Sequence, residues 1–174
     1  MTQLESAKAG KITREMRQVA AREGLEEEFI LQGIAEGNIV IPANIKHLNL
    51  EPRGVGKGLS TKINANIGTS SDYGDVNTEM QKLKVCLEAK ADAVMDLSTG
   101  GDIPAIRQAI IAACPLPLGT VPIYQAGVVT MRKQDAMVKM TVDDLFAAIE
   151  DHARDGVDFI TVHCGVTRAA IDRL

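Results

Sequence analysis

Four apolar segments of the chain each end in polar residues, and helix-sized stretches separate them. The segments read KINANIGTS, AVMDLSTGGD, GTVPIYQA and FITVHCGVT, and they cover residues 62–70, 93–102, 119–126 and 159–167. Short apolar runs that alternate with helical stretches are typical of βα units around a parallel sheet. The pattern therefore predicts an α/β protein in which strands and helices alternate.

A polar or soft side chain stands at the end of each predicted strand. These residues are Asn66, Met95 with Asp96, Tyr124 and His163. In proteins built from βα repeats, the active site gathers where the strands end and the following loops begin. Core strands usually end in turn residues rather than in an amide, a phenol and an imidazole. The four strand ends therefore predict a single substrate pocket.

Each candidate also has a structural explanation when it is considered alone. Asn66 precedes Gly-Thr-Ser and can cap the following loop. Met95 can fill space in a core, and the Tyr124 ring can pack while its hydroxyl finds an acceptor. A lone strand histidine such as His163 is more often a core residue than a ligand. The position of all four at strand ends is what favours function.

Asp96 follows Met95 and is expected to point to the opposite side of its strand. A buried carboxylate is costly unless it is paired. Asp96 therefore either lies in the pocket or is bound by a neighbour such as Lys62, and the sequence leaves both possibilities open.

The composition argues against two classes of function. Of the 174 residues, 45% are hydrophobic but only 3% are aromatic, which suits aliphatic parallel strands buried on both faces. With 19 Lys and Arg against 23 Asp and Glu, the chain has no basic stripe and few rings for base stacking, so nucleic-acid binding is not expected. No run reaches the ~18 apolar residues of a membrane helix, and the N-terminus lacks a signal-peptide core. We expect a cytoplasmic protein.

The three cysteines, Cys86, Cys114 and Cys164, are far apart and have no metal-ligand spacing. Cys86 and Cys114 lie among aliphatic residues and are predicted to be buried and inert. The absence of a C-x-x-C motif and the odd count agree with a reducing compartment.

Residues 1–59 differ from the rest and are predicted to form a small N-terminal lead-in domain with a linker. Residues 12–24 and 25–37 read as helices, with Thr13 as an N-cap and Gly24 and Gly37 as stops, and residues 38–41 read as a short strand. The glycine-rich stretch 54–58 does not match a phosphate-binding loop, because Gly58 follows Lys57 where Ser or Thr is needed. It is predicted to be a flexible connector.

Capping residues define the helices of the repeats. Asp75 begins a helix that runs to about residue 90, Asp102 one that runs to about residue 113, and Thr141 with Asp144 one that stops at Gly156. The predicted strands after the first are residues 93–98, 116–124 and 159–164. A last helix begins near residue 167. Residues 127–140 can form a lid, a helix or a disordered segment, and His152 is predicted to be solvated.

Several long segments together resemble one enzyme family. Besides the four runs above, they include IAEGNIVIPANIKH at residues 34–47 and GVGKGLSTKINANIGTS at residues 54–70. With these the chain resembles the phosphomethylpyrimidine synthase family, radical S-adenosylmethionine (radical SAM) enzymes of thiamine biosynthesis. In one respect the chain departs from the family, because the C-x2-C-x4-C cluster motif near the family's C-terminus is not present in this sequence.

The resemblance implies the N-terminal part of a (β/α)8 TIM barrel. Residues 1–59 would be the lead-in domain, and residues 60–174 would be the first half of the barrel, with about four βα units. The cluster-binding C-terminal domain would be absent. From spacing alone, a complete and small four-stranded open α/β domain is an equally good description.

The resemblance also implies a reaction, in which 5-aminoimidazole ribotide is converted to 4-amino-5-hydroxymethyl-2-methylpyrimidine phosphate. Asn66, Met95, Tyr124 and His163 match family residues that bind the ribotide. The full-length family uses a [4Fe–4S] cluster, S-adenosylmethionine and a divalent metal, zinc or iron, and is homodimeric. We expect none of these cofactors to bind this chain alone, which should be inactive, and the catalytic residues remain unassigned.

Two other functions remain open. The chain can be a non-catalytic βα module that binds a phosphorylated metabolite or a partner chain. It can also be a self-contained lyase with His163 and Asp96 as acid and base, which requires both side chains within ~3 Å of one substrate atom.

Overall fold

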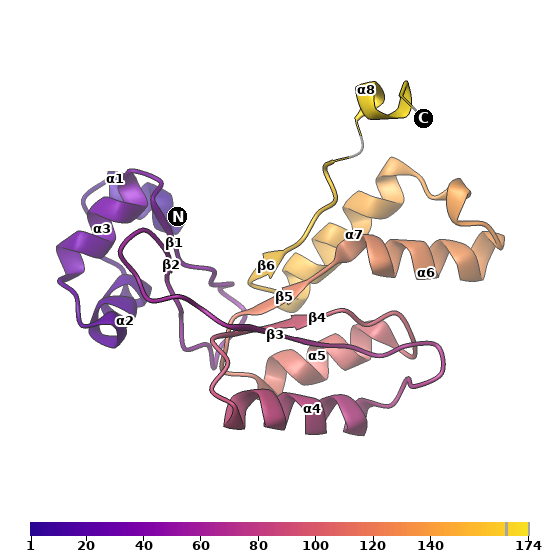
Figure 1. Cartoon of the computed structure of the whole chain (residues 1–174), viewed down its shortest axis with the longest axis horizontal. Helices are drawn as coiled ribbons and strands as arrows, with labels where there is room; N and C mark the ends of the chain where they lie inside the picture. Colours follow the sequence, from indigo (N-terminus) through magenta and orange to yellow (C-terminus); the bar gives the residue numbers. More distant parts are fainter. Residues whose placement is uncertain (166, 174) are drawn as a thin grey trace.

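The computed structural model describes residues 1–165 and 167–173, and from residue 64 onward each strand is followed by one or more helices (Figure 1). The helical elements are α1 (Gln3–Lys8), α2 (Arg14–Glu23), α3 (Glu27–Ala35), α4 (Val76–Glu88), α5 (Ile103–Ala113), α6 (Pro122–Gln134), the 3₁₀ turn η1 (Met137–Lys139), α7 (Val142–Asp155) and α8 (Arg168–Ile171). The strands are β1 (Ile39–Val40), β2 (Val55–Gly56), β3 (Asn64–Ile67), β4 (Ala93–Asp96), β5 (Leu118–Thr120) and β6 (Phe159–Ile160). Within the described part of the chain, no helix has the length and apolar character needed to cross a bilayer.

The central sheet has four parallel strands in the order β3-β4-β5-β6. Each strand pairs with the next one along the chain. One helix lies between β3 and β4 and one between β4 and β5, whereas α6, η1 and α7 lie between β5 and β6. The predicted α/β class with a parallel sheet is thereby confirmed.

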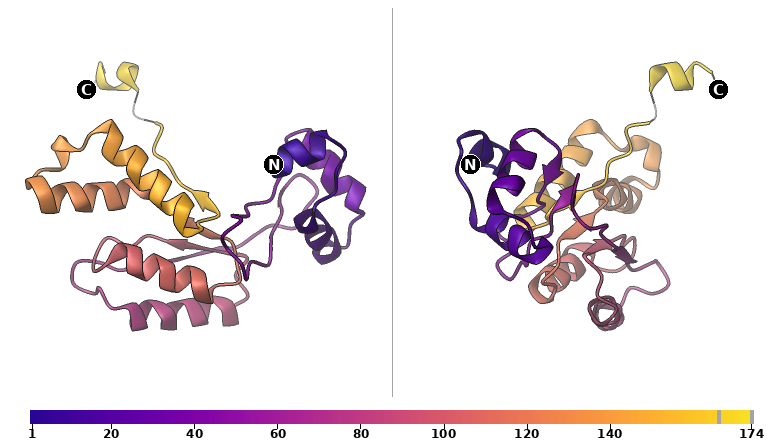
Figure 2. Two further views of the ribbon diagram at one scale, coloured as in Figure 1. Left: turned by 180° about the vertical axis from the view of Figure 1, so that it is seen from behind. Right: turned by 60° about the vertical axis from the view of Figure 1, so that its left-hand side comes forward.

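One face of the sheet packs against α4 and α5, which lie side by side in both views of Figure 2. The core between these layers is aliphatic and includes Val94 and Leu118 from the strands and Ile106 and Ile110 from α5. The four isoleucines of α5 are all buried, namely Ile103, Ile106, Ile110 and Ile111.

Most predicted helix ends agree with the structure, because their caps are local. The side chains of Thr13, Asp75 and Asp102 each accept a hydrogen bond from a backbone N–H of the first turn of their helix. Thr141 and Asp144 form the predicted capping box of α7, and Gly156 ends that helix in the left-handed region.

The N-terminal segment has its own hydrophobic core, separate from that of the sheet, with Met16, Val19, Ile30 and Ile34 at its centre. Helix α1, which the sequence analysis does not predict, is stabilised by a capping box of Thr2 and Glu5. The prediction of a flexible connector at residues 54–58 is wrong. This stretch contains β2, which pairs antiparallel with β1.

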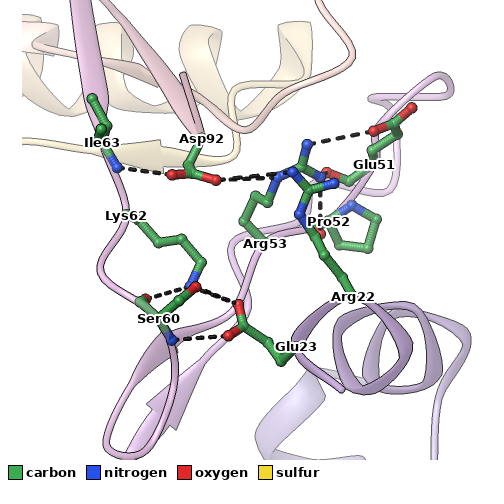
Figure 3. A network of polar contacts seen from close by, with 9 residues as sticks. All are labelled: Arg22, Glu23, Glu51, Pro52, Arg53, Ser60, Lys62, Ile63 and Asp92. Atoms are coloured by element: carbon green, nitrogen blue, oxygen red, sulfur yellow. Dashed lines mark hydrogen bonds and ion pairs between the residues drawn. The ribbon is translucent and has the colours of Figure 1, made fainter. Parts of the chain in front are cut away.

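Polar contacts fasten the N-terminal segment to the beginning of the sheet (Figure 3). Glu23 of α2 accepts hydrogen bonds from Ser60 and pairs with Lys62 at 2.7 Å. Asp92, just before β4, accepts a hydrogen bond from the Ile63 N–H at 3.0 Å. The Arg53 Nε atom lies 3.7 Å from Asp92, which is an ion-pair distance but too long for a hydrogen bond.

A second attachment is a buried ion pair between His47 and Asp158. His47 Nδ1 lies 2.7 Å from the Asp158 carboxylate and Nε2 lies 2.7 Å from the Cys114 carbonyl oxygen. Both partners only accept, so both imidazole nitrogens donate and the ring is an imidazolium. Burial alone would lower the pKa of His47, but the bond to Asp158 and its charge outweigh burial and raise the pKa. This contact joins residues far apart in the sequence.

Two predicted strand bounds are wrong at their C-terminal ends. The strand expected at residues 116–124 is β5 (Leu118–Thr120), and α6 begins directly at Pro122. Proline fixes φ near the helical value and lacks an N–H, so it favours the first turn of a helix and ends the strand. Residues 127–140 are the rest of α6 and η1. The strand expected at 159–164 is β6 (Phe159–Ile160), because its partner β5 is itself short.

Candidate functional site

One face of the sheet carries two of the four predicted substrate residues side by side. In the register of the parallel strands, Asn66 pairs with Met95, Met95 with Gly119, and Gly119 with Phe159. The residues that alternate with this row, such as Val94 and Leu118, belong to the core beneath α4 and α5. Asn66 and Met95 therefore lie on the opposite face, away from these helices.

Gly119 leaves room for an aromatic ring on that face. A Cβ atom at residue 119 would stand 2.3 Å from the Phe159 ring, which no side chain permits. The ring consequently lies across the sheet next to Met95. Met95 also receives a weak contact from the Thr161 hydroxyl, whose oxygen lies 3.8 Å from the methionine sulfur. No sequence pattern indicates that Phe159 or Thr161 belongs to this surface.

The other two predicted residues come together at the neighbouring end of the sheet. Tyr124 is not at a strand end, as predicted, but in the first turn of α6, and it is half-buried. His163 is exposed and follows β6 in an irregular segment. The two ring centroids are 6.3 Å apart with an interplanar angle of 34°. This distance is within the range of aromatic contacts.

Hydrogen bonds between side chains and the backbone hold the loops after β3 and β4 in place. The Glu79 side chain, fully buried, accepts a hydrogen bond from the Gly68 N–H at 2.8 Å. Thr69 donates from its N–H to the Ser98 hydroxyl and from its own hydroxyl to the Gly100 carbonyl oxygen. These contacts fix the backbone just beyond Asn66.

Asp96 points into the interior rather than toward the site. Its carboxylate accepts hydrogen bonds from the Ser98 N–H and hydroxyl, at 2.9 and 2.5 Å. Burial raises the pKa of Asp96, against the opposing effect of the Ser98 hydrogen bonds. Lys62, the neighbour suggested from the sequence, pairs with Glu23 instead. Because Asp96 and Met95 lie on opposite faces, Asp96 is not a suitable acid–base partner for His163.

A buried polar network lies directly beside Tyr124. Arg107 of α5 donates from Nε and Nη2 to the Asp155 carboxylate of α7 at 2.9 and 2.6 Å, and from Nη1 to the Gln125 Oε1 at 2.6 Å. The His152 Nε2 lies 3.1 Å from the same Gln125 oxygen, and its Nδ1 lies 2.7 Å from the Thr120 hydroxyl of β5.

The prediction that His152 is solvated is wrong, since the residue is 2% exposed. Burial lowers the pKa of His152 to about 4, and the positive charge of Arg107 acts in the same direction. The many charged residues of α7 make a solvent-exposed helix the obvious interpretation of its sequence. The helical period nevertheless places His152 on the same face as Ala148, four residues earlier, and both residues are buried.

An apolar cavity of about 450 Å³ lies at the amino ends of the same strands. Met95 and Phe159 line it, together with Asn64 and Arg53. Asn66, Tyr124 and His163 are not among its lining residues. Of the four predicted substrate residues, Met95 alone lines this cavity.

The cysteines do not form a metal site. Cys114 is buried, as predicted, and burial raises the pKa of its thiol to about 11. Cys86 is only half-buried, and Cys164 is exposed. Among residues 1–165 and 167–173, no group of three or more His, Cys, Asp or Glu side chains is arranged to hold a metal ion.

Comparisons with known proteins agree on one family. A sequence model described as the radical SAM ThiC family matches residues 2–174. The chain is 58% identical over its whole length to the phosphomethylpyrimidine synthase of Desulforamulus reducens and 59% identical to that of Moorella thermoacetica. It is 61% identical over 172 residues to that of Dehalococcoides mccartyi. The chain spans about 40% of the length of these relatives.

Proposed function

This chain belongs to the radical SAM ThiC family, and on that premise we propose that it forms the substrate-binding part of a phosphomethylpyrimidine synthase of thiamine biosynthesis. The whole enzyme would convert 5-aminoimidazole ribotide to 4-amino-5-hydroxymethyl-2-methylpyrimidine phosphate. The chain spans about 40% of the length of its relatives, and the role that we propose for these residues is to bind and orient the substrate.

The observation that supports this proposal is the pairing of the four candidate residues, since two are in register on the open face of the sheet and the other two bring their rings together. Asn66 and Met95 are neighbours in register, and the Tyr124 and His163 rings are 6.3 Å apart. An amide, a phenol and an imidazole offer donors and acceptors for a phosphorylated ribotide. The Met95 thioether can border the imidazole ring of the substrate without competing for its hydrogen bonds.

The architecture that we propose is the first half of a (β/α)8 barrel, residues 60–174, preceded by a lead-in domain at residues 1–59. The four parallel strands with intervening helices support the first part, since a barrel of eight strands repeats this unit. The separate core of α1, α2 and α3 supports the second. We further propose a cytoplasmic homodimer for the whole enzyme.

A radical SAM family implies a [4Fe–4S] cluster and S-adenosylmethionine in the full-length enzyme, which would supply the radical chemistry. The residues present do not fit the cluster, because Cys114 is buried and Cys86 and Cys164 are distant in the sequence from it and from each other. We derive no step through the cluster, nor through the divalent metal, zinc or iron, that the family resemblance implies.

Calorimetric titration of the chain with 5-aminoimidazole ribotide tests the proposal. We expect weak saturable binding that falls further in His163→Ala, while Ala109→Ser on α5 serves as a control outside the site. Lack of binding by the unaltered chain would contradict a substrate site in these residues. Binding that His163→Ala leaves unchanged would instead favour a general phosphate-binding module.

A further inference from the structure

We propose that Gln125 is the positioning residue for Tyr124, and that the buried network of Arg107, His152 and Thr120 holds Gln125 in place. This inference rests on the proposed function, because it assigns a support to one of the substrate-binding residues. It concerns a residue next to the site that contacts no substrate itself.

The start of α6 needs such an anchor. The N-cap residue, Val121, has an apolar side chain that cannot accept a hydrogen bond from the helix. The backbone bond from the Tyr124 N–H to the Val121 carbonyl oxygen, at 3.0 Å, closes the first turn but does not attach it to the rest of the fold. Gln125, the next residue, is 7% exposed and reaches into the interior. Its side chain therefore fixes the rotation of the turn that carries Tyr124.

The roles of donor and acceptor in the network follow from the Arg107 guanidinium, which carries no acceptor. Arg107 can only donate, so the oxygen of the Gln125 amide must face it. That same oxygen faces His152 Nε2, which must then carry the imidazole hydrogen. In the neutral ring, His152 Nδ1 is then the acceptor and the Thr120 hydroxyl the donor. The ring is neutral because burial and the charge of Arg107 lower the pKa of His152 to about 4.

The network joins four elements, and at its centre is the side-chain oxygen of Gln125 in α6. Thr120 belongs to β5, Arg107 to α5 and His152 to α7, and Gln125 receives a hydrogen bond from the last two. Asp155 holds the guanidinium of Arg107 through two nitrogens. A fully satisfied buried network specifies one arrangement of its elements. The position of Tyr124 relative to His163 is thereby linked to the packing of α5 and α7.

Tyrosine fluorescence tests this positioning directly. The chain has two tyrosines and no tryptophan, and Tyr73 is 76% exposed. In a Tyr73→Phe background, Tyr124 is thus the single strong fluorophore. We expect Gln125→Met, which keeps length but removes the acceptor, to increase the amplitude of nanosecond depolarisation of Tyr124. Gln125→Glu keeps an acceptor oxygen and should restore the restricted motion.

Thr120→Val and Thr120→Ser provide a milder pair if Gln125→Met does not fold. The valine removes the hydroxyl that His152 requires and should increase the motion of Tyr124, whereas the serine retains the hydroxyl and should not. Unchanged depolarisation in folded Gln125→Met, or in Thr120→Val, would overturn the assignment.

A ribotide titration of the same variants separates the two proposals. If the site binds substrate, Gln125→Met should raise the Kd about two- to tenfold, the equivalent of one net hydrogen bond. Gln125→Glu should bind the ribotide with the Kd of the unaltered chain. If the unaltered chain binds nothing, the proposed function fails, but the fluorescence result still decides whether Gln125 positions Tyr124.

Discussion

The two halves of the candidate site are held in place by different means. Asn66 and Met95 belong to β3 and β4, where backbone hydrogen bonds fix the register and the following loops are tied to each other. Tyr124 and His163 lie outside the strands, one in the first turn of α6 and one in an exposed segment after β6. We refer to these as the strand-held half and the side-chain-held half. The second half is held by side-chain contacts, namely the buried bonds of Gln125 beside Tyr124 and the ring contact between Tyr124 and His163.

Close glycine packing gives the strand-held half little freedom. A Cβ atom at Gly100 would stand 1.9 Å from the Ser70 carbonyl oxygen, and one at Gly74 would stand 3.0 Å from Gly101. The loops after β3 and β4 therefore touch backbone to backbone. In the other half, a Cβ atom at Gly165 meets nothing within 4 Å.

The largest expected effect is that of Arg107→Met, which removes the centre of the buried network. Losing one partner of a buried ion pair costs roughly 3–5 kcal/mol, and we expect the lower end, about 3 kcal/mol, because Asp155 is 18% exposed. Urea unfolding measures the loss. Hydrogen exchange should accelerate mainly in α6 and α7, and equal acceleration in α4 would contradict the separation into two halves.

Gly100→Ala should damage the strand-held half selectively. The added methyl group cannot be accommodated without moving the backbone of Ser70, so we expect a loss of about 1–3 kcal/mol, as for other overpacked sites. Gly165→Ala is the matched control and should change the unfolding free energy by less than about 0.5 kcal/mol. Equal effects of the two substitutions would show that the close approach of Gly100 to Ser70 does not contribute to the stability of this half.

Acid should loosen the side-chain-held half first. The pKa of His152 is about 4 in the folded protein, below its usual 6.5, so the fold favours the neutral ring. Its contribution to stability is complete above pH 6.5 and is lost as the pH falls from 6.5 toward 4. His47, whose pKa is raised, stays protonated over this range. Hydrogen exchange measured against pH should show α6 and α7 opening, and a flat profile in those helices would refute the assignment.

The smallest effect is a difference in thiol labelling. Cys164 is exposed beside His163 and should react fastest with a maleimide, Cys86 more slowly, and Cys114 slowest because it is buried with a raised pKa. Ribotide should slow labelling of Cys164 without affecting Cys86. Rapid labelling of Cys114 in the folded chain would mean that the core beneath the sheet opens readily.

Sequence reasoning succeeded where the determinants are local. The caps at Asp75, Asp102 and Thr141 and the aliphatic pattern of the strands identify the helices and the parallel sheet. It failed at Tyr124, because Pro122 starts a helix within what reads as an apolar strand.

The buried network was also out of reach of sequence reasoning. Its members, Arg107, Gln125 and His152, come from three helices, and their contact depends on packing that no local pattern specifies. The spacing of His152 from Ala148 was the one available indication.

The most direct test of the central claim is an NMR titration with 5-aminoimidazole ribotide. The chain would carry labels on the methionine methyl groups, the asparagine side-chain amides and the rings of tyrosine and histidine. We predict that the Met95 methyl and Asn66 amide of one half, and the Tyr124 and His163 rings of the other, shift together with a single Kd. Shifts confined to one half, or different Kd values for the two halves, would contradict a shared substrate site.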